Sequence, residues 1–421
     1  MIPVDEFAER RQKLFDQMAE SSILVVFSGV AKSSSADEFY PFEVNRNFYY
    51  LTGIDQEDSA LILVNSEGER REFLFVSPFD PVKEKWYGKR LTPQEATAKS
   101  GIRNVLLNNA LTAKVDSALS DKFYEFGEIH TVYLDLEKEQ KIAEATTTHE
   151  YQDSLLKIYP GLAVLDCYPL IVKLRLVKSE NEINELRAAI RHTQLGIAAV
   201  MALARPGVKE YELADEFLKV INDDNGYQGV SFPTIMASGV HGACLHYPTP
   251  LDMVKKGDLV LMDLGSRENY YCADITRTVP ANGHFDELQK TVYEIVLGCN
   301  KMIASLAKPG LTIKDLQNAT VEYLGSECLQ KGLIAKKDDI VNYYFHGISH
   351  HIGLDTHDPG DRTAPLEPGN IISDEPGLYM KDRGLGIRIE DDLLITKDGC
   401  EVLSKDIIKE TKDIELFYKN R

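Results

Sequence analysis

The sequence predicts an α/β (α+β) protein with an N-terminal α/β domain and a second domain that is built as an internal repeat. The chain has 421 residues, which is more than one hydrophobic core usually serves. Strand-like and helix-like segments alternate up to about residue 170, and a different pattern begins near Ile171. Two similar helix-plus-strand units then follow one another. We therefore expect one domain at residues 1–172 and a second at residues 173–421.

The first domain is predicted from short apolar runs separated by polar segments. Residues 23–27 form one compact apolar run, and residues 132–136 form another strand candidate. Residues 60–64 and 73–76 flank the polar segment 65–71, which indicates a hairpin. Strands mixed with helical segments in this way are typical of an α/β domain.

A long helix is expected to open the second domain at about residue 173. Ser179 followed by Glu182 forms a capping box, in which the two side chains bind the first free backbone amides of a helix. Ile183, Leu186 and Ile190 then continue at helical spacing.

The second domain carries an internal repeat. Residues 204–208 (ARPGV) and 307–311 (AKPGL) each precede a helical stretch, and similar turns precede two apolar runs downstream. The offset from Gly257 to Gly369 is 369 − 257 = 112, and that from Asp263 to Glu375 is 375 − 263 = 112. Each copy therefore places a carboxylate at the end of an apolar strand.

Composition indicates an ordinary globular protein with acidic character. Hydrophobic residues make up 43% and charged residues 27% of the chain, and the formal net charge is −19. A negative field repels phosphate backbones and anionic lipids, so we expect neither nucleic-acid nor membrane partners.

The cysteines and the N-terminal segment favour the cytoplasm. The six cysteines are widely scattered without a C-x-x-C pair, which predicts neither a disulfide framework nor a zinc knuckle and fits a reducing compartment. Residues 1–20 lack the apolar core of a signal peptide. No apolar run approaches the roughly 20 residues of a membrane span.

Four carboxylates and a histidine-rich segment indicate a dinuclear metal site. Asp263 and Asp274 flank one turn-like segment, and Glu375 and Glu390 flank another, so each pair can meet across a hairpin. Four buried carboxylates would repel one another strongly, and two divalent cations would cancel their charge. Residues 346–358 hold four of the ten histidines and can supply an imidazole ligand. An oxygen-rich site with one histidine favours Mn(II), with Co(II) or Zn(II) as alternatives.

The same segments resemble the signatures of the pita-bread metallopeptidases, which include methionine aminopeptidase, prolidase and aminopeptidase P. The matching segments follow the family order, at residues 262–265 (MDLG), 271–278 (YCADITRT), 346–358, 374–379 (DEPGLY) and 386–392 (GIRIEDD). The resemblance implies a pita-bread (creatinase/aminopeptidase-like) catalytic domain with a pseudo-twofold internal repeat. It implies the metal ligands Asp263, Asp274, His350, Glu375 and Glu390.

Further residues receive roles from this resemblance. Glu375 is expected to accept and pass on the proton, and Arg388 and Tyr379 are expected to support the ligand carboxylates. The family's substrate-facing positions are matched by His246 and His357, and a position near the active-site wall by His346. His241 and His351 match none of these positions, and we expect a structural or surface role for His351.

The first domain narrows the activity within the family. Residues 46–53 (RNFYYLTG) resemble the N-domain signature of aminopeptidase P, which some prolidases share. Ser349 before His350 and the tail at residues 402–418 also resemble aminopeptidase P. Trp86 lies in a segment similar to one that reaches a neighbouring subunit's active site in that enzyme, although it can equally be a simple core or surface aromatic. The resemblance implies a homodimer or homotetramer.

The expected activity is removal of the N-terminal residue from peptides with proline in second position, using water activated by two metal ions. Proline selectivity rests on the resemblance alone. The main alternative is prolidase, which cleaves only Xaa-Pro dipeptides. Two others are a creatinase-like hydrolase acting on another C–N bond and a binding module that has lost catalysis.

Overall fold

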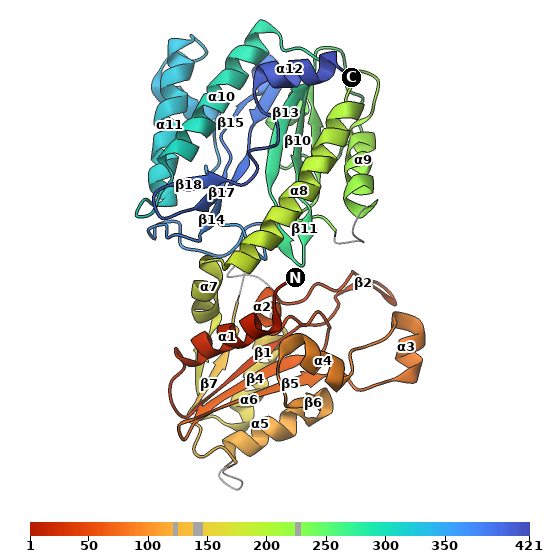
Figure 1. Ribbon diagram of the computed structural model, residues 1–421, viewed down its shortest axis with the longest axis vertical. Coiled ribbons are helices and arrows are strands. Elements are labelled where there is room, and N and C mark those ends of the chain that lie inside the picture. Colours follow the sequence, from red (N-terminus) through yellow and green to blue (C-terminus); the bar gives the residue numbers. More distant parts are fainter. Residues whose placement is uncertain (121–124, 138–145, 224–228) are drawn as a thin grey trace. The chain divides into compact units, whose positions relative to one another are not determined.

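The computed structural model describes residues 1–120, 125–137, 146–223 and 229–421 (Figure 1). The chain forms two compact units, one from Ile2 to Arg175 and one from Leu176 to Arg421 that also includes Met1. The domain boundary expected at 172/173 therefore falls inside helix α7 (Tyr168–Leu176). Most of α7 belongs to the first unit because the Arg175 guanidinium is buried there and donates to Asn47 Oδ1 at 2.8 Å.

The first unit is built on a six-stranded mixed sheet with the order β6-β5-β4-β1-β7-β8. Strands β1, β4 and β5 pair antiparallel, whereas β6, β7 and β8 join the sheet in parallel. The strands are β1 (Ser22–Phe27), β4 (Ala60–Ser66), β5 (Glu69–Val76), β6 (Val105–Leu107), β7 (Thr131–Leu134) and β8 (Ala163–Asp166). A short separate hairpin joins β2 (Ser33–Ser35) and β3 (Glu38–Phe39).

The hairpin expected around residues 65–71 is present, but its turn is tighter than the sequence indicated. Strand pairing continues to Ser66 and Glu69, and only Glu67 and Gly68 form the turn. Both turn residues have positive φ, 57° and 71°, the backbone of a two-residue turn that matches the twist of its strands. Polar residues therefore extend the ladder instead of forming a long loop.

Helix α2 (Arg46–Thr52) contains the sequence motif of the first unit. The Asn45 side chain caps it by accepting a hydrogen bond from the Phe48 amide at 2.8 Å. Gly53 ends it at φ 66°, and a Cβ there would lie 2.5 Å from the ring of Phe7. The motif's glycine is thus required both by the backbone and by the packing of α1 (Val4–Phe15).

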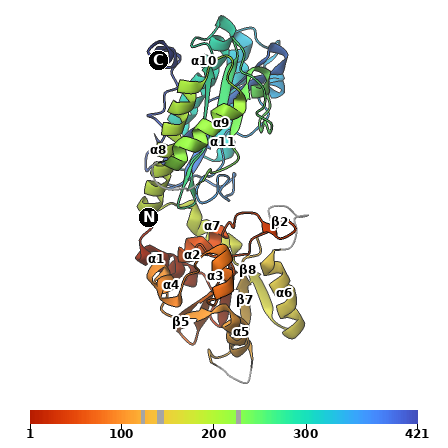
Figure 2. The same cartoon turned by 90° about the vertical axis from the view of Figure 1, so that its right-hand side faces the viewer.

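Helices α4 (Pro93–Ser100), α5 (Leu111–Leu119) and α6 (Thr147–Ile158) lie around the sheet (Figure 2), whereas α3 (Pro81–Tyr87) buries none of its residues. Val115 of α5 and Leu155 of α6 share a core cluster with Ile23 and Ile62 of the sheet.

The second unit begins with α7's last residue and the long helix α8 (Glu180–Leu203). The predicted capping box is confirmed: the Glu182 amide donates to Ser179 Oγ at 3.2 Å, and the Ser179 amide donates to Glu182 Oε2 at 2.9 Å. The helix does not start at about residue 173, because the cap fixes its first turn after Ser179. Its partner is α9 (Glu210–Asp223).

Two helices followed by antiparallel strands occur twice in this unit. The first copy has α8 and α9, then β9 (Ile235–Ser238), β10 (Leu259–Leu264) and β13 (Ile275–Pro280) in one sheet. The second copy has α10 (Glu287–Leu306) and α11 (Ile313–Gln330), then β14 (Ile371–Asp374), β17 (Asp391–Ile395) and β18 (Cys400–Val402). Each copy also contains a small hairpin. The first copy has β11 (Arg267–Glu268) paired with β12 (Tyr271–Cys272), and the second has β15 (Gly377–Met380) paired with β16 (Leu385–Arg388). The last helix is α12 (Thr411–Lys419).

Matching glycines mark the two copies. Gly207 and Gly310 precede α9 and α11 with φ of 95° and 89°, and Gly257 and Gly369 precede β10 and β14 with φ of 89° and 94°. Because this left-handed backbone favours glycine, the repeated glycines reflect a repeated turn. The architecture agrees with the pita-bread fold that the resemblance implied.

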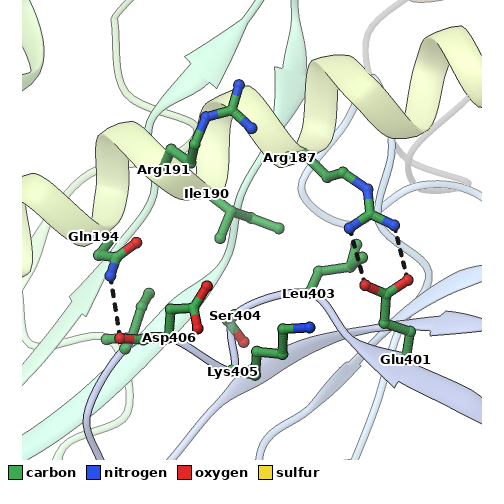
Figure 3. Close-up of a pocket in the computed structure, with 10 residues that line it drawn as sticks. Arg187, Ile190, Arg191, Gln194, Glu401, Leu403, Ser404, Lys405 and Asp406 are labelled. Carbon is green, nitrogen blue, oxygen red and sulfur yellow. Dashed lines mark hydrogen bonds and ion pairs between the residues drawn. The ribbon is translucent and has the colours of Figure 1, made fainter.

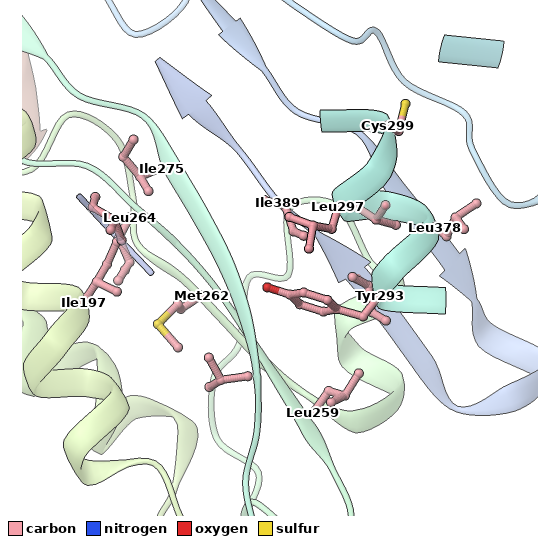
Figure 4. Packing of buried hydrophobic residues seen from close by; sticks show 14 of the residues in the cluster. Ile197, Leu259, Met262, Leu264, Ile275, Tyr293, Leu297, Cys299, Leu378 and Ile389 are labelled. Carbon is pink, nitrogen blue, oxygen red and sulfur yellow. The ribbon is translucent and has the colours of Figure 1, made fainter. Parts of the chain in front are cut away.

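Helices cover the strands so completely that β10 is buried along its whole length. Met262 and Leu264 of β10 belong to the same core as Ile197 of α8 and Tyr293 of α10 (Figure 4). Asp263, between these two residues, points to the other face of the strand, where it is also buried and requires a compensating partner. Among the helices in the described ranges, none combines the length and apolar character that crossing a bilayer demands.

Candidate metal centre

Four carboxylates lie at strand ends contributed by both copies of the repeat. Asp263 is on β10, and Asp274 directly precedes β13, the antiparallel partner of β10. Glu375 directly follows β14, and Glu390 directly precedes β17. The β15–β16 hairpin joins Glu375 to Glu390, as the turn-like sequence between them indicated.

The ligand atoms of these acids and of His350 converge in three overlapping groups, each within 4.8 Å. The groups are Asp263 with Asp274 and Glu390, His350 with Glu375 and Glu390, and Asp274 with His350 and His357. His350 Nε2 lies 3.4 Å from Asp274 Oδ2 and 3.5 Å from Glu375 Oε1. All five expected ligands thus meet in one place, together with His357, which the sequence placed on the substrate side.

Burial and mutual repulsion strongly perturb these groups. Burial and the nearby Asp263 charge raise the pKa of Asp274 to about 7, although the hydrogen bond with His350 opposes the rise. Burial and the charges of Asp274 and Glu375 raise the pKa of Glu390 well above its usual range. Burial lowers the pKa of His350, but its contacts with Asp274 and Glu375 outweigh this and raise the pKa to about 9. The protein alone therefore does not neutralise the cluster in its ionised form.

The donor set fits divalent cations. Asp263 Oδ1 is buried and has no hydrogen-bond partner among the described residues. A buried carboxylate oxygen without a donor is costly, and a bound cation would satisfy it. Four carboxylates with one or two imidazoles and no cysteine form the oxygen-rich set that harder divalent ions prefer.

Arg388 and Thr276 orient two of the acids. Arg388 Nη2 donates to Asp263 Oδ2 at 2.6 Å, and Arg388 Nε donates to Thr276 Oγ1 at 3.0 Å. Thr276 Oγ1 in turn donates to Glu390 Oε2 at 2.7 Å. The sequence indicated the supporting role of Arg388 but missed Thr276, whose only signal is a hydroxyl in the otherwise buried strand β13.

The hydrogen-bond partner of His350 Nδ1 leaves Nε2 as the ring nitrogen that can bind a metal once it loses its proton. His350 Nδ1 lies 3.0 Å from the carbonyl oxygen of His351, which can only accept, so Nδ1 carries the hydrogen. Ser373 Oγ accepts from the His350 amide at 3.0 Å and donates to Glu375 Oε1 at 3.2 Å. The sequence also did not identify Ser373, whose hydroxyl links the backbone of His350 to the carboxylate of Glu375.

A second charged network lies behind Glu390. Arg277 Nη1 donates to the carbonyl oxygen of Glu390 at 2.6 Å, and Nη2 donates to Asp391 Oδ1 at 2.8 Å. Lys409 donates to Asp391 Oδ2 and, at 2.7 Å, to Asn300 Oδ1. Lys409, which follows β18, therefore takes part in holding the start of β17, next to Glu390.

A hydrogen-bonded chain runs from Arg388 to His346. Arg388 Nη1 donates to the Tyr379 hydroxyl oxygen at 3.1 Å, and that hydroxyl lies 2.7 Å from His346 Nε2. Because His346 Nδ1 faces the carbonyl oxygen of Gly347 at 2.8 Å, Nε2 accepts the Tyr379 hydrogen. Burial lowers the pKa of His346, which keeps the ring neutral in this chain.

The remaining histidines occupy different settings. His246 and His357 are exposed, and the ring centroid of His357 lies 4.2 Å from that of His350. His351 is buried, its backbone bridges to Asp358 and Ile372, and burial lowers its pKa to about 4. His351 is thus a structural residue, whereas His246 and His357 are accessible to a ligand.

Trp86 lies in the first unit, on α3, with 78% of its surface exposed. Phe79, Val82 and Tyr87 beside it are also exposed. Trp86 is therefore not a core aromatic.

A separate surface pocket is lined by α8 and by residues after Cys400 (Figure 3). Arg187 closes one side with a two-pronged ion pair to Glu401, at 3.0 and 2.8 Å. On the other side Gln194 Nε2 donates to the Asp406 carbonyl oxygen at 3.1 Å. This pocket is distinct from the carboxylate cluster.

The sequence matches two known protein families. Residues 184–397 match metallopeptidase family M24, and residues 7–124 match the aminopeptidase P N-terminal domain.

The chain also resembles individual proteins over its full length. It is 32% identical to Xaa-Pro aminopeptidase of Haemophilus influenzae, over 98% of this chain and 97% of that protein. It is 33% identical to Xaa-Pro aminopeptidase of Escherichia coli, again over 98% and 97%. The solved structure of Zn-substituted E. coli aminopeptidase P in complex with product matches with a TM-score of 0.90 at 31% identity, covering 100% of this chain and 99% of that one. A solved structure from Bacillus anthracis matches with a TM-score of 0.96 at 38% identity, with the same coverage.

Proposed function

Because the chain belongs to metallopeptidase family M24, we propose that it is a Xaa-Pro aminopeptidase, which removes the residue before proline from the N-terminus of a peptide. The observation that carries this function is the full-length match to Xaa-Pro aminopeptidases, combined with the meeting of four acids and His350 in one cluster. The complete ligand set disfavours both a creatinase-like hydrolase and an inactive binding module.

The prolidase alternative is less well supported. The relatives that match over 97% of their own length are named Xaa-Pro aminopeptidases, and the first unit matches the aminopeptidase P N-terminal domain. The two activities differ in the length of peptide accepted. An aminopeptidase should cleave Xaa-Pro-Xaa tripeptides with a higher kcat/KM than Xaa-Pro dipeptides, and the reverse order would identify a prolidase.

The cofactor of this activity is a pair of divalent ions, with Mn(II) preferred and Co(II) or Zn(II) as alternatives. Their ligands are Asp263, Asp274, His350, Glu375 and Glu390. When bound, such ions supply an activated water and polarise the peptide carbonyl. The preference for Mn(II) follows from the excess of carboxylate oxygens over imidazoles.

The chain's own residues handle the proton and the substrate. Glu375 is only partly buried, and its carboxylate takes the proton of the attacking water and passes it to the proline nitrogen, the leaving group. His246 and His357, both exposed, orient the peptide and stabilise the oxyanion that develops on its carbonyl. His346 forms part of the wall and is held by Tyr379.

Arg388 and Tyr379 act through the ligands. Arg388 fixes one oxygen of Asp263 and supports Tyr379, so the carboxylate keeps a single orientation. Neither residue needs to touch the substrate for this role.

The biological unit is a homodimer or homotetramer in which α3 contacts a second copy of the chain. The exposed aromatic and aliphatic side chains around Trp86 support this contact, since a cluster of exposed apolar residues favours association. Trp86 then contributes to substrate binding in the neighbouring subunit. The six cysteines, all within the described residues, form no disulfide, which supports a cytoplasmic location.

A further inference from the structure

The carboxylate of Glu210, the first residue of α9, is completely buried and receives hydrogen bonds from a single loop. At one end of that loop the Ser238 amide and hydroxyl both donate to Oε1 at 2.7 Å. At the other end the Asp252 amide donates to Oε2 at 3.2 Å. One carboxylate thus fastens both ends of residues 238–252, here called the β9–β10 loop.

His241 links the same carboxylate to the outer end of the loop. Its Nδ1 lies 2.9 Å from Glu210 Oε1, and its Nε2 lies 3.5 Å from Asp252 Oδ2. The imidazole also stacks on Tyr247, with ring centroids 4.4 Å apart and an interplanar angle of 18°. His241 matched no functional position of the family, and the structure shows it inside the anchor of the loop.

The opposite side of the β9–β10 loop rests directly on β16. A Cβ on Gly242 would lie 3.1 Å from the carbonyl oxygen of Gly386, and a Cβ on Gly386 would overlap the Gly242 backbone. Two glycines therefore let two backbones meet without side chains between them. Since β16 also carries Arg388, which binds the ligand Asp263, the loop's position is fixed relative to the metal ligands.

His246 lies between these attachment points along the chain, and its side chain is exposed and near enough to His357 for an electrostatic interaction. An exposed histidine on a loop has no packing of its own to hold it, so its location depends on the anchors on either side. A buried carboxylate is a costly way to secure a loop unless it is fully hydrogen-bonded, and Glu210 receives a donor on each oxygen.

We propose that Glu210 is a positioning residue that, together with His241, holds the β9–β10 loop so that His246 faces the substrate. This inference rests on the proposed function, because the position of His246 matters only if that residue contacts a peptide. Glu210 itself is enclosed and acts through the loop. A small displacement of a side chain that orients the substrate lowers the catalytic rate strongly.

A double-mutant cycle tests the proposal. Glu210→Gln keeps the shape of the side chain but removes its charge and turns one acceptor into a donor that faces the loop's own donors. We expect kcat/KM for an Xaa-Pro-Xaa tripeptide, with Mn(II) added, to fall about 10- to 100-fold. In a His246→Ala background the same substitution should change kcat/KM by less than about twofold, because the group being positioned is gone.

Equal effects of Glu210→Gln with and without His246 would overturn the inference. Glu401→Gln is the matched control, since it also removes a paired carboxylate of this unit, at the pocket shown in Figure 3, and should leave kcat/KM unchanged. His241→Phe is a milder second variant that keeps the aromatic ring on Tyr247 and removes the Nδ1 donor. It should lower kcat/KM in the same direction, and full wild-type activity would exclude His241 from the anchor.

Hydrogen exchange of the metal-free protein separates this inference from the proposed function. In Glu210→Gln, amides of residues 239–251 should exchange at least about tenfold faster, while those of β10 keep their wild-type rates. Unchanged exchange in the loop would overturn the anchoring role. If the wild-type protein failed to cleave any Xaa-Pro peptide while the exchange result held, the peptidase assignment would fall and the loop anchor would stand.

Discussion

The guanidinium of Arg388 and the carboxylate of Asp263 are joined by a hydrogen bond of 2.6 Å between side chains from opposite copies of the repeat. The bond occupies only Asp263 Oδ2, and the buried Oδ1 is left without a donor among the described residues. An acid held by one oxygen and open at the other is well prepared to bind a cation.

Replacement of Arg388 should therefore weaken metal binding. In Arg388→Met, Asp263 and Tyr379 lose a donor, and we expect Mn(II) affinity or kcat/KM to fall about 10- to 100-fold. Titration calorimetry of the chelator-treated protein measures the affinity. Arg383→Met serves as control, because Arg383 lies in the turn of the same hairpin and donates to the Leu333 carbonyl oxygen instead. Equal affinity in Arg388→Met and wild type would contradict the supporting role.

Loss of His350 or Asp274 should abolish metal-dependent cleavage while leaving the fold largely intact. His350→Ala removes the imidazole whose Nε2 faces two acids, so we expect less than the wild-type number of bound ions. Elemental analysis after dialysis counts the ions, and circular dichroism checks the fold. His284→Ala, at an exposed histidine, should behave like wild type. Full activity of His350→Ala after chelation and metal add-back would refute the ligand assignment.

The metal-free protein should lose stability as the pH rises. The pKa of Asp274 is raised to about 7 in the folded state, so the folded protein binds more protons than the unfolded chain between the ordinary Asp pKa and pH 7. His350, with its pKa raised to about 9, adds stability below pH 6.5 that disappears as the pH rises through 9. Both effects make the metal-free protein less stable as the pH rises. Tm in excess chelator should therefore be lower at pH 9 than at pH 6.

Metal should reverse this trend, because ligands bind cations in their deprotonated forms. The increase in Tm on adding Mn(II) should grow between pH 6 and pH 9. Asp274→Asn should flatten the pH dependence of the metal-free Tm. A metal-free protein whose Tm rises steadily over this range would show that the acids are not mutually destabilised.

Trp86 should be needed in the neighbouring subunit. Trp86→Ala is expected to lower kcat/KM without changing the number of bound ions, because it lies outside the ligand cluster. Mixed oligomers of Trp86→Ala and His350→Ala chains should regain activity, since one chain supplies the ligands and the other the tryptophan. Light scattering reports the oligomer, and Lys99→Ala, at an exposed residue of α4 outside this apolar cluster, is the control. A monomer in solution, or no regain of activity on mixing, would exclude this role.

The sequence predicted the parts of this protein that depend on local pattern. The Ser179–Glu182 capping box follows from spacing within one short segment. The matched carboxylates follow from similar short segments in the two copies of the repeat. It missed Thr276 and Ser373 because their importance comes from hydrogen bonds across strands, to Glu390 and to Glu375. No local pattern distinguishes such a hydroxyl from any other in a strand.

The role of His241 could not be predicted from local sequence either. Its partners Glu210 and Asp252 stand 31 residues before it and 11 residues after it, and only the packing of α9 against the following strands brings them together. The helix boundary expected near residue 173 was wrong for a different reason, since residue 173 lies inside the separate helix α7 and the long helix begins only after the Ser179 cap.

The tail network has a consequence for how the second unit assembles. Lys409, which follows β18 in the chain, balances the charge of Asp391, next to the candidate ligand Glu390. The start of β17 therefore gains its full set of partners only when the segment after β18 folds back onto it. We expect this segment and β17 to unfold together as one cooperative part of the unit.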